Sequence, residues 1–230
     1  MRFRRTNRSE RRGAGRSRGH VAHVDRARAR DPAAHRRCAR AARNGADRCR
    51  ADLRSRGDHR LQDRPQGVIT YANDVFVRVS GYAEREILGS PHNLIRHPAM
   101  PRAVFQLMWE VIPAGREIFA YVVNLAADGG HYWVLAHVTP SFAPDGSVVG
   151  YHSNRRWVPP ATRRTVGDLY ARIRAVEDAQ SRTPDRIAAG RAALDAALAD
   201  AGATYDEFVW SLAAADDASD APGSAVAGVR

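Results

Sequence analysis

The hydrophobic pattern of the chain changes near Gly67, where short β-type runs separated by turn residues begin. Residues 68–71 (VITY) are β-branched or aromatic, which predicts a strand. Residues 74–80 (DVFVRVS) alternate valine with other residues as far as Gly81, and this alternation predicts a short strand or an extended turn. Packed structure is therefore expected to begin close to Gly67.

Helical spacing follows this first region. Residues 83–88 predict a short helix that ends at Gly89, and residues 92–96 predict a turn. Residues 101–112 begin with a proline, stop before Pro113, and carry apolar side chains three and four positions apart. A helix with such a stripe is expected to face the core. The stripe consists of Val104, Phe105, Met108, Val111 and Ile112.

Three longer strands are predicted next, at residues 117–125, 131–142 and 147–157. Asp-Gly-Gly and Pro-Asp-Gly separate these strands, and both sequences permit the positive φ angles of hairpin turns. The pattern therefore predicts an antiparallel meander. Together with the preceding short elements it predicts an α+β fold, with a pocket between the sheet and the helices that cover it.

The last third of the chain is rich in alanine and has helical periodicity. Residues 165–180 and 185–200 predict two helices, and residues 204–212 (TYDEFVWSL) predict a short third one. Their apolar faces are expected to pack on each other, on the sheet, or on a partner chain. The tail from Ala213 onward consists mainly of alanine, aspartate, glycine and serine, and we expect it to be disordered.

The charge of the chain is divided unevenly along its 230 residues, for which the net charge is +11. Residues 1–66 carry 21 arginines and 7 acids, whereas residues 67–230 carry 15 arginines and 18 acids. The basic character therefore belongs to the first segment. Residues 1–62 also lack apolar periodicity, so this Arg-rich segment is predicted to be disordered.

Two further interpretations of the Arg-rich segment stay open. An arginine arm can bind nucleic acid by releasing counterions, but this one contains Phe3 alone as an aromatic and no recognisable module, so nucleic-acid binding is disfavoured. The second interpretation is a wrongly assigned start or a shifted reading frame, because the composition changes abruptly just before Gly67.

Several classes of protein are disfavoured by what the sequence lacks. No run of about 18 uncharged apolar residues is present, so we expect no membrane span, and the Arg-rich start does not resemble a secretory signal. We therefore expect a soluble, cytoplasmic protein. Cys38 and Cys49 are too few for a zinc quartet or a disulfide framework. The absence of phosphate-loop, nucleophile-elbow and kinase motifs predicts that the chain is not an enzyme.

Six short motifs occur in one order and carry a family resemblance. They are residues 67–73 (GVITYAN), 76–81 (FVRVSG), 89–101 (GSPHNLIRHPAMP), 128–133 (DGGHYW), 138–140 (VTP) and 149–156 (VGYHSNRR). Residues 62–158 thereby resemble the sensory PAS domains of bacterial aerotaxis receptors. The resemblance implies a PAS fold, with a five-stranded antiparallel sheet flanked by short helices and a cavity that holds FAD non-covalently as a redox sensor. The expected organisation is an Arg-rich segment at 1–62, a PAS domain at 63–159 and a helical extension at 160–230 with a disordered tail.

The resemblance also implies which residues would bind the flavin. The flavin region of the receptors falls on Arg96, His97 and Pro98 of this sequence, while Asn73 and Asn124 match two receptor asparagines. Two positions depart from the receptor pattern. Ile118 stands where the receptors carry tryptophan, and Ala99 stands where they carry an acid.

The chemistry of a flavin agrees with the residue types available. A flavin ring needs apolar faces, directed hydrogen bonds at its edge and cations near its pyrophosphate. Core packing is the competing interpretation of Trp133, and capping of a helical turn is that of His97. Candidate faces are Trp109, Phe119, Tyr121 and Trp133; candidate polar groups are Asn73, Asn93 and Asn124; candidate cations are Arg96 and Arg116.

Haem is the alternative cofactor, because some PAS domains bind iron through histidine. The candidate ligands are His92, His97, His131, His137 and His152. A photoreceptor that forms a cysteinyl-flavin adduct is excluded, since no cysteine follows Cys49.

Three functions follow from these patterns. The first is a soluble PAS sensor of redox state or oxygen, which signals in an aerotaxis or chemotaxis pathway by contact with a chemotaxis-type receptor or another signalling protein. The second is a cofactor-free PAS module for interaction or dimerisation, and a homodimer is left open in both cases. The third and least favoured is nucleic-acid binding through the Arg-rich arm.

Overall fold

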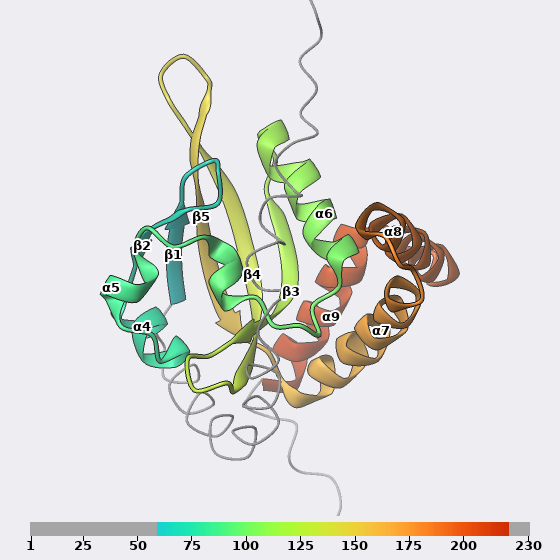
Figure 1. Cartoon of the computed structure of the whole chain (residues 1–230). Helices are drawn as coiled ribbons and strands as arrows, with labels where there is room; N and C mark the ends of the chain where they lie inside the picture. The colour runs from blue at the N-terminus through green and yellow to red at the C-terminus, as the bar shows by residue number, and fades with distance from the viewer. Residues whose placement is uncertain (1–58, 221–230) are drawn as a thin grey trace, which may run out of the picture. The chain divides into compact units, whose positions relative to one another are not determined.

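The computed structural model describes residues 59–220, with side chains as far as residue 215 (Figure 1). The disorder predicted for residues 1–62 therefore lies mostly outside the described residues. In chain order, with η for a 3₁₀ helix, the elements are β1 (His59–Asp63), β2 (Ile69–Ala72), α4 (Asp74–Ser80), α5 (Glu84–Ile87), η1 (His92–Ile95), α6 (Arg102–Val111), η2 (Ile112–Ala114), β3 (Ile118–Leu125), β4 (His131–Phe142), β5 (Val148–Trp157), α7 (Pro160–Asp178), α8 (Thr183–Asp200) and α9 (Tyr205–Asp220).

The five strands form one sheet in the order β2-β1-β5-β4-β3, and every neighbouring pair is antiparallel. The predicted α+β fold with a five-stranded antiparallel sheet, short helices and C-terminal helices is confirmed. The meander is also confirmed, and β4 has the predicted bounds. Its regularity follows from the two glycine turns, in which Gly129 and Gly146 have φ angles of 86° and 82°.

One face of the sheet, which we call the inner face, packs against α4, η1 and α6. Phe76 of α4 stacks on His59 of β1, with 4.5 Å between ring centroids. Trp109 of α6 contacts the ring of Tyr151 on β5 edge-on, at 5.8 Å. Small and apolar side chains of β3 and β4 fill the middle of this face, and they include Ala120, Val122, Val134, Ala136 and Val138.

The opposite face, which we call the outer face, packs against α7 and α9. Trp133 of β4 stacks on Tyr170 of α7 at 6.0 Å, and the Tyr170 hydroxyl donates to the carbonyl oxygen of Tyr121 at 2.7 Å. Phe119 of β3 meets Trp210 of α9 at 4.6 Å. Both faces of β3 and β4 are therefore covered by helices.

The predicted strand or extended turn at residues 74–80 is wrong, because these residues form helix α4. Asn73 caps the helix by accepting from the backbone N–H of Phe76 at 3.0 Å, and Gly81 ends it with a φ angle of 72°. Phe76, Val79 and Ser80 are buried, at helical rather than alternate spacing. Capping and tertiary burial thus outweigh the β propensity of the valines.

Both ends of the folded region extend beyond the predicted limits. Strand β1 begins at His59, inside the segment that was predicted to be disordered to residue 62. It contains one aliphatic side chain, Leu61, but its backbone pairs with both β2 and β5. Helix α9 continues to Asp220, past the predicted end at Leu212, because alanines follow that residue and favour a helix.

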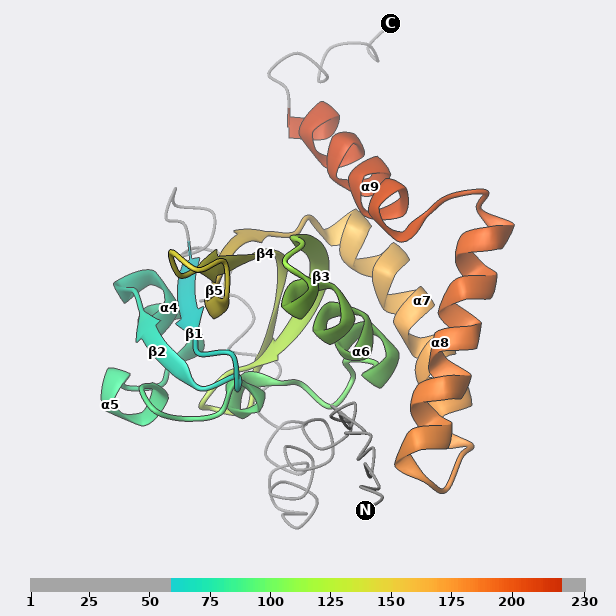
Figure 2. The ribbon, with the colours of Figure 1, turned by 90° about the horizontal axis from the view of Figure 1, so that it is seen from above.

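The C-terminal helices α7 and α8 form an antiparallel pair beside α6. Seen from above, α6 lies between β3 and α8, while α7 runs alongside α8 (Figure 2). Within residues 59–220, no helix is long and apolar enough to cross a membrane. The arrangement connects the extension at residues 160–220 directly to the helix that covers the inner face.

Candidate ligand site on the inner face

A chain of polar side chains lies on the inner face between β1, η1 and β5. Asp63 Oδ2 is 2.6 Å from His92 Nδ1, and His92 Nε2 is 2.9 Å from Arg155 Nη2. Arg155 Nε also donates to Ser153 Oγ at 2.9 Å. Strand alternation explains the grouping, because residues 59, 61 and 63 pair across to residues 155, 153 and 151 on the same face.

The hydrogen-bond donors among these polar side chains determine which ring nitrogen of His92 carries the proton. A guanidinium nitrogen can only donate, so His92 Nε2 accepts from Arg155 and His92 Nδ1 carries the proton that Asp63 accepts. Arg155 is only 3% exposed, and burial lowers its pKa while Tyr132 and Asp63 act to raise it. The arrangement holds a buried cation opposite one buried carboxylate, with a neutral imidazole between them.

Several buried polar atoms in and around this group of hydrogen-bonded side chains make no hydrogen bond within the described part of the protein. They are both ring nitrogens of His59, Oδ1 of Asp63, Nδ2 of Asn124 and Nη1 of Arg155. Asn124 is 1% exposed and pairs across the sheet with Tyr132, whose ring lies 5.9 Å from His59. Buried polar groups are normally hydrogen-bonded, so this set marks a place where polar atoms of a ligand or water would be stabilised.

The structure gives Asn73 a structural role. Its Oδ1 accepts from the backbone N–H groups of Phe76 and Arg60, at 3.0 and 3.1 Å. Both lone pairs of the amide oxygen are thereby used in holding α4 against β1. The Asn73 amide oxygen is therefore engaged within the protein and does not lie with Asn124 as a group for the edge of a flavin ring.

Arg96 and His97 lie where the segment before α6 crosses β3. Arg96 forms an isolated bridge to Asn124, and its guanidinium donates to the carbonyl oxygen of Met100 at 3.2 Å while covering the ring of Phe105 at 4.5 Å. His97 Nδ1 accepts from the N–H of Ala99 at 3.1 Å, which agrees with the capping interpretation of that histidine. The structure thus brings Arg96 and Asn124 together through the backbone.

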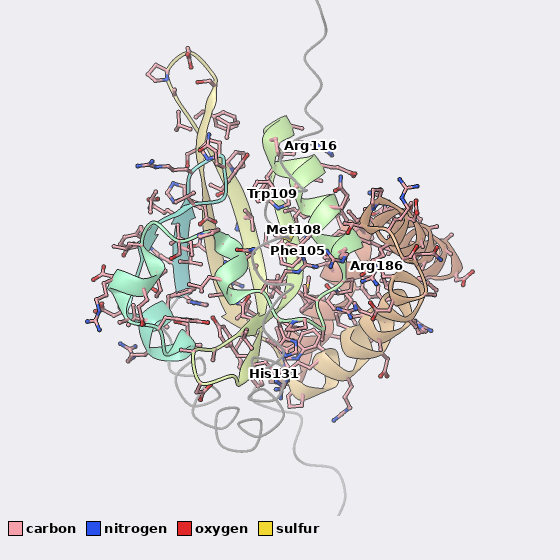
Figure 3. The ribbon with its side chains drawn as sticks, in the orientation of Figure 1. Phe105, Met108, Trp109, Arg116, His131 and Arg186 are labelled. Carbon is pink, nitrogen blue, oxygen red and sulfur yellow. The ribbon has the colours of Figure 1, made fainter. Side chains whose placement is uncertain are left out.

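Trp109 lies on the inner face, on the side of α6 that faces the sheet (Figure 3). Its ring touches Gly67, where an added Cβ would be 3.3 Å from the indole and where φ is 72°. Phe105 and Met108 share this side of the helix and are half-buried like Trp109. The helix therefore presents apolar side chains to the face that holds Asn124.

Phe119 lies on the outer face. Its ring is parallel to that of His137, at 4.0 Å and 4°, and Trp210 of α9 covers it. Tyr121 and Trp133 share this face, so three of the four candidate faces for a flavin pack against α7 and α9 instead. Phe119 and Asn124 are five positions apart on one strand, and they point to opposite sides of the sheet.

Most of the remaining candidates are engaged or exposed. Arg116 is exposed beyond the end of α6 that is farther from Arg96. Asn93 lies in η1 and is half-buried. His131 stands 5.0 Å from His97 between ring centroids, and burial, followed by the charge of Arg163, lowers its pKa.

Most of the histidines considered as haem ligands are engaged with other side chains or exposed. Both ring nitrogens of His92 are occupied, His137 Nε2 is 2.8 Å from Glu117, and His152 is exposed on β5. Among the residues that the structure describes, no three His, Cys, Asp or Glu side chains are grouped to bind a metal ion.

The sequence pattern alone does not point to His59, Asp63 or Arg155. The first two precede the region in which packed structure was expected, and Arg155 was not singled out among the arginines. A signal was present in β5, where Tyr151, Ser153 and Arg155 share one face under strand alternation. That register would have placed an arginine among buried positions.

We expect His59 to make the fold less stable in acid. Burial, followed by the positive charge of Arg155, lowers the pKa of its ring well below the usual value. The unfolded chain binds a proton at this histidine below about pH 6.5 and the folded chain does not, so the free energy of unfolding falls as the pH decreases from there, by up to about 1.4 kcal/mol per pH unit. Urea unfolding of His59→Leu between pH 7 and pH 5 should show a slope smaller by about one proton. An unchanged slope would contradict the conclusion that His59 is uncharged in the folded protein.

The sequence matches one protein-family model and several characterised proteins. The protein-family model described as PAS fold matches residues 69–155. The chain is 40% identical to the aerotaxis receptor of Escherichia coli (strain K12) over 125 residues, which is 54% of this chain and 24% of the receptor. It is 33% identical to the nitrogen fixation regulatory protein of Klebsiella pneumoniae over 88 residues, or 38% of this chain and 18% of that protein. The chain thus spans about a quarter or less of the length of these two relatives.

Among solved structures, a light-oxygen-voltage domain studied with a flavin analogue is similar to this chain. The match covers 53% of this chain and 93% of that chain, with 18% sequence identity and a TM-score of 0.45.

Proposed function

Because residues 69–155 of this chain form a PAS domain that is homologous to those of signalling proteins, we propose that the chain is a flavin-dependent sensor of redox state or oxygen. In this proposal FAD binds on the inner face of the sheet. The signal leaves through contact of the C-terminal helices with a chemotaxis-type receptor or another signalling protein, and the chain itself catalyses no reaction. The 40% identity to an aerotaxis receptor supports this choice of pathway.

The observation that carries the proposal is the buried amide of Asn124. Its Nδ2 group is a donor without a hydrogen-bond acceptor among the described residues, on the inner face beside Arg96. The edge of a flavin ring offers carbonyl oxygens and ring nitrogens that accept such bonds, so the residue fits the group. Bound FAD would supply the change of redox state.

Other residues of the inner face complete the fit. Trp109, Met108 and Phe105 would provide an apolar surface for the ring. Arg155, whose Nη1 makes no hydrogen bond within the described residues, would provide a donor at the β5 side. Arg96 would contribute a cation near the start of α6, where its guanidinium already covers Phe105.

An absorption spectrum of the purified full-length protein, before and after dithionite, tests this proposal. We expect flavin bands near about 370 and about 450 nm that bleach on reduction. Asn124→Ala should lose most of the bound flavin, whereas the matched variant Asn154→Ala should retain it because Asn154 is exposed on β5. A Soret band would show that the cofactor is haem and not flavin. A colourless, folded protein would contradict the binding of either cofactor.

The alternative is a cofactor-free PAS module for interaction or dimerisation. The position of Phe119, Tyr121 and Trp133 on the outer face favours it, because these side chains serve packing against α7 and α9 rather than a ligand. A colourless protein whose sedimentation shows a stable dimer would support this alternative.

A further inference from the structure

A buried carboxylate of α7 holds the start of helix α6. Glu177 is 1% exposed, and its Oε2 and Oε1 accept from the backbone N–H groups of Arg102 and Ala103, at 3.0 and 2.9 Å. The first N–H groups of a helix have no partner within the helix, and they carry its positive dipole end. Glu177 therefore caps α6 from a helix that lies 74 residues later in the chain.

Two neighbours of Glu177 complete this contact. Gly190 of α8 leaves room for the carboxylate, because an added Cβ would lie 2.4 Å from Glu177 Oε1 and 2.7 Å from its Cγ. One turn earlier on α7, Arg174 donates to the carbonyl oxygen of Pro98 and pairs with Asp178 at 2.7 Å. We call Arg174, Glu177 and Gly190 the α6 clamp.

Helix α8 also contacts α6 farther along. Arg191 Nη1 lies 2.8 Å from Glu110 Oε2, and Arg191 is held in place by Asp195 on its own helix at 2.9 Å. These groups are substantially exposed, so the pair adds little energy, but it keeps α8 aligned with α6. Glu177 and Gly190 are the buried part of the contact between these helices and α6.

The segment that the clamp holds is the same one that borders the candidate site. Arg96 bridges to Asn124, and the N–H of His97 donates to the carbonyl oxygen of Val123 at 3.3 Å. Residues 96–103 thus touch β3 at one end and α7 at the other. A movement of this segment at the site must either carry α7 with it or break the bonds to Glu177.

We propose that the α6 clamp couples the inner-face site to the α7–α8 pair, so that the ligand state of the site sets how firmly these helices are docked. The identity of the ligand rests on the proposed function, whereas the coupling rests on the clamp itself. A buried carboxylate that loses its hydrogen bonds is strongly destabilised, so the contact has two states, formed and released, rather than a continuous range. Release would free α7 and α8 together, because Glu177 and Gly190 are in contact.

Hydrogen–deuterium exchange of the full-length protein tests the coupling without a ligand. In Glu177→Gln the side-chain NH₂ group faces an N–H donor, so one of the two bonds to α6 is lost. We expect the amides at the start of α6 and those of α8 to exchange about tenfold faster than in the wild type. Asp168→Asn, which removes an exposed carboxylate from the same helix, should change neither. Faster exchange in α6 alone would reduce Glu177 to a simple cap and overturn the proposal.

A second measurement uses the reciprocity of coupling. If the site and the clamp are coupled, Glu177→Gln and Arg174→Met should each change the affinity for added FAD by about fivefold or more, and they should remove any difference in α8 exchange between oxidised and reduced protein. An unchanged affinity with normal flavin binding would contradict the coupling. If the protein binds no FAD, the proposed function fails, and the exchange experiment without ligand decides the clamp separately.

Discussion

Gly190→Ala should lower the free energy of unfolding by about 2 kcal/mol. The new methyl group would lie within 3.0 Å of three atoms of the Glu177 carboxyl group and stem, and both Glu177 and Gly190 are buried. Overpacking of this kind costs about 3 kcal/mol, and the higher helix propensity of alanine offsets about 1 kcal/mol of that loss. Urea unfolding at neutral pH measures the difference.

Gly167→Ala is the matched control, because it makes the same substitution in the neighbouring helix α7. Its added Cβ would meet only Trp133, at 3.9 Å, which is an ordinary contact. We expect this variant to be as stable as the wild type or more stable, by up to about 1 kcal/mol. A Gly190→Ala protein as stable as Gly167→Ala would show that Glu177 can move aside without loss.

The meander could be predicted from the sequence because its signals are local. Alternation and two glycine turns fix β4 to its exact bounds, whereas α4 was misassigned because its valines alternate as they do in a strand. The helix is decided by the Asn73 cap and by burial of Phe76, and the second of these depends on residues elsewhere in the chain. Local pattern is thus reliable only where no distant contact competes with it.

The candidate site was predictable only in part, and the reason lies in the sheet. Strand β3 is buried on both faces, so its sequence offers no polar side that would tell Phe119 from Asn124. The resemblance to aerotaxis receptors singled out Asn124, and the chemistry of a flavin ring added Phe119. Only the structure shows that Trp210 of α9 covers the ring of Phe119 on the outer face. The buried cation Arg155 escaped notice because arginine is normally a surface residue, and its partner Asp63 lies more than 90 positions earlier.

That buried cation leads to the second large effect, in Asp63→Asn. The substitution keeps the shape of the side chain but removes the carboxylate that is linked to Arg155 through His92. A buried charge that loses its counter-charge is left uncompensated, which costs about 3 kcal/mol or more. We therefore expect the free energy of unfolding in urea at pH 7 to fall by about that amount.

Two further variants separate this explanation from a general effect of losing an acid. Glu117→Gln also removes a carboxylate that pairs with a histidine, but Glu117 is 62% exposed, so the loss of stability should stay below about 1 kcal/mol. The double variant Asp63→Leu with Arg155→Met removes both buried charges and should be more stable than Asp63→Asn alone, since no unpaired ion remains. If Asp63→Asn lowers the free energy of unfolding no more than Glu117→Gln does, groups other than Asp63 must stabilise the charge of Arg155. A ligand could then bind to Asp63 without destabilising Arg155.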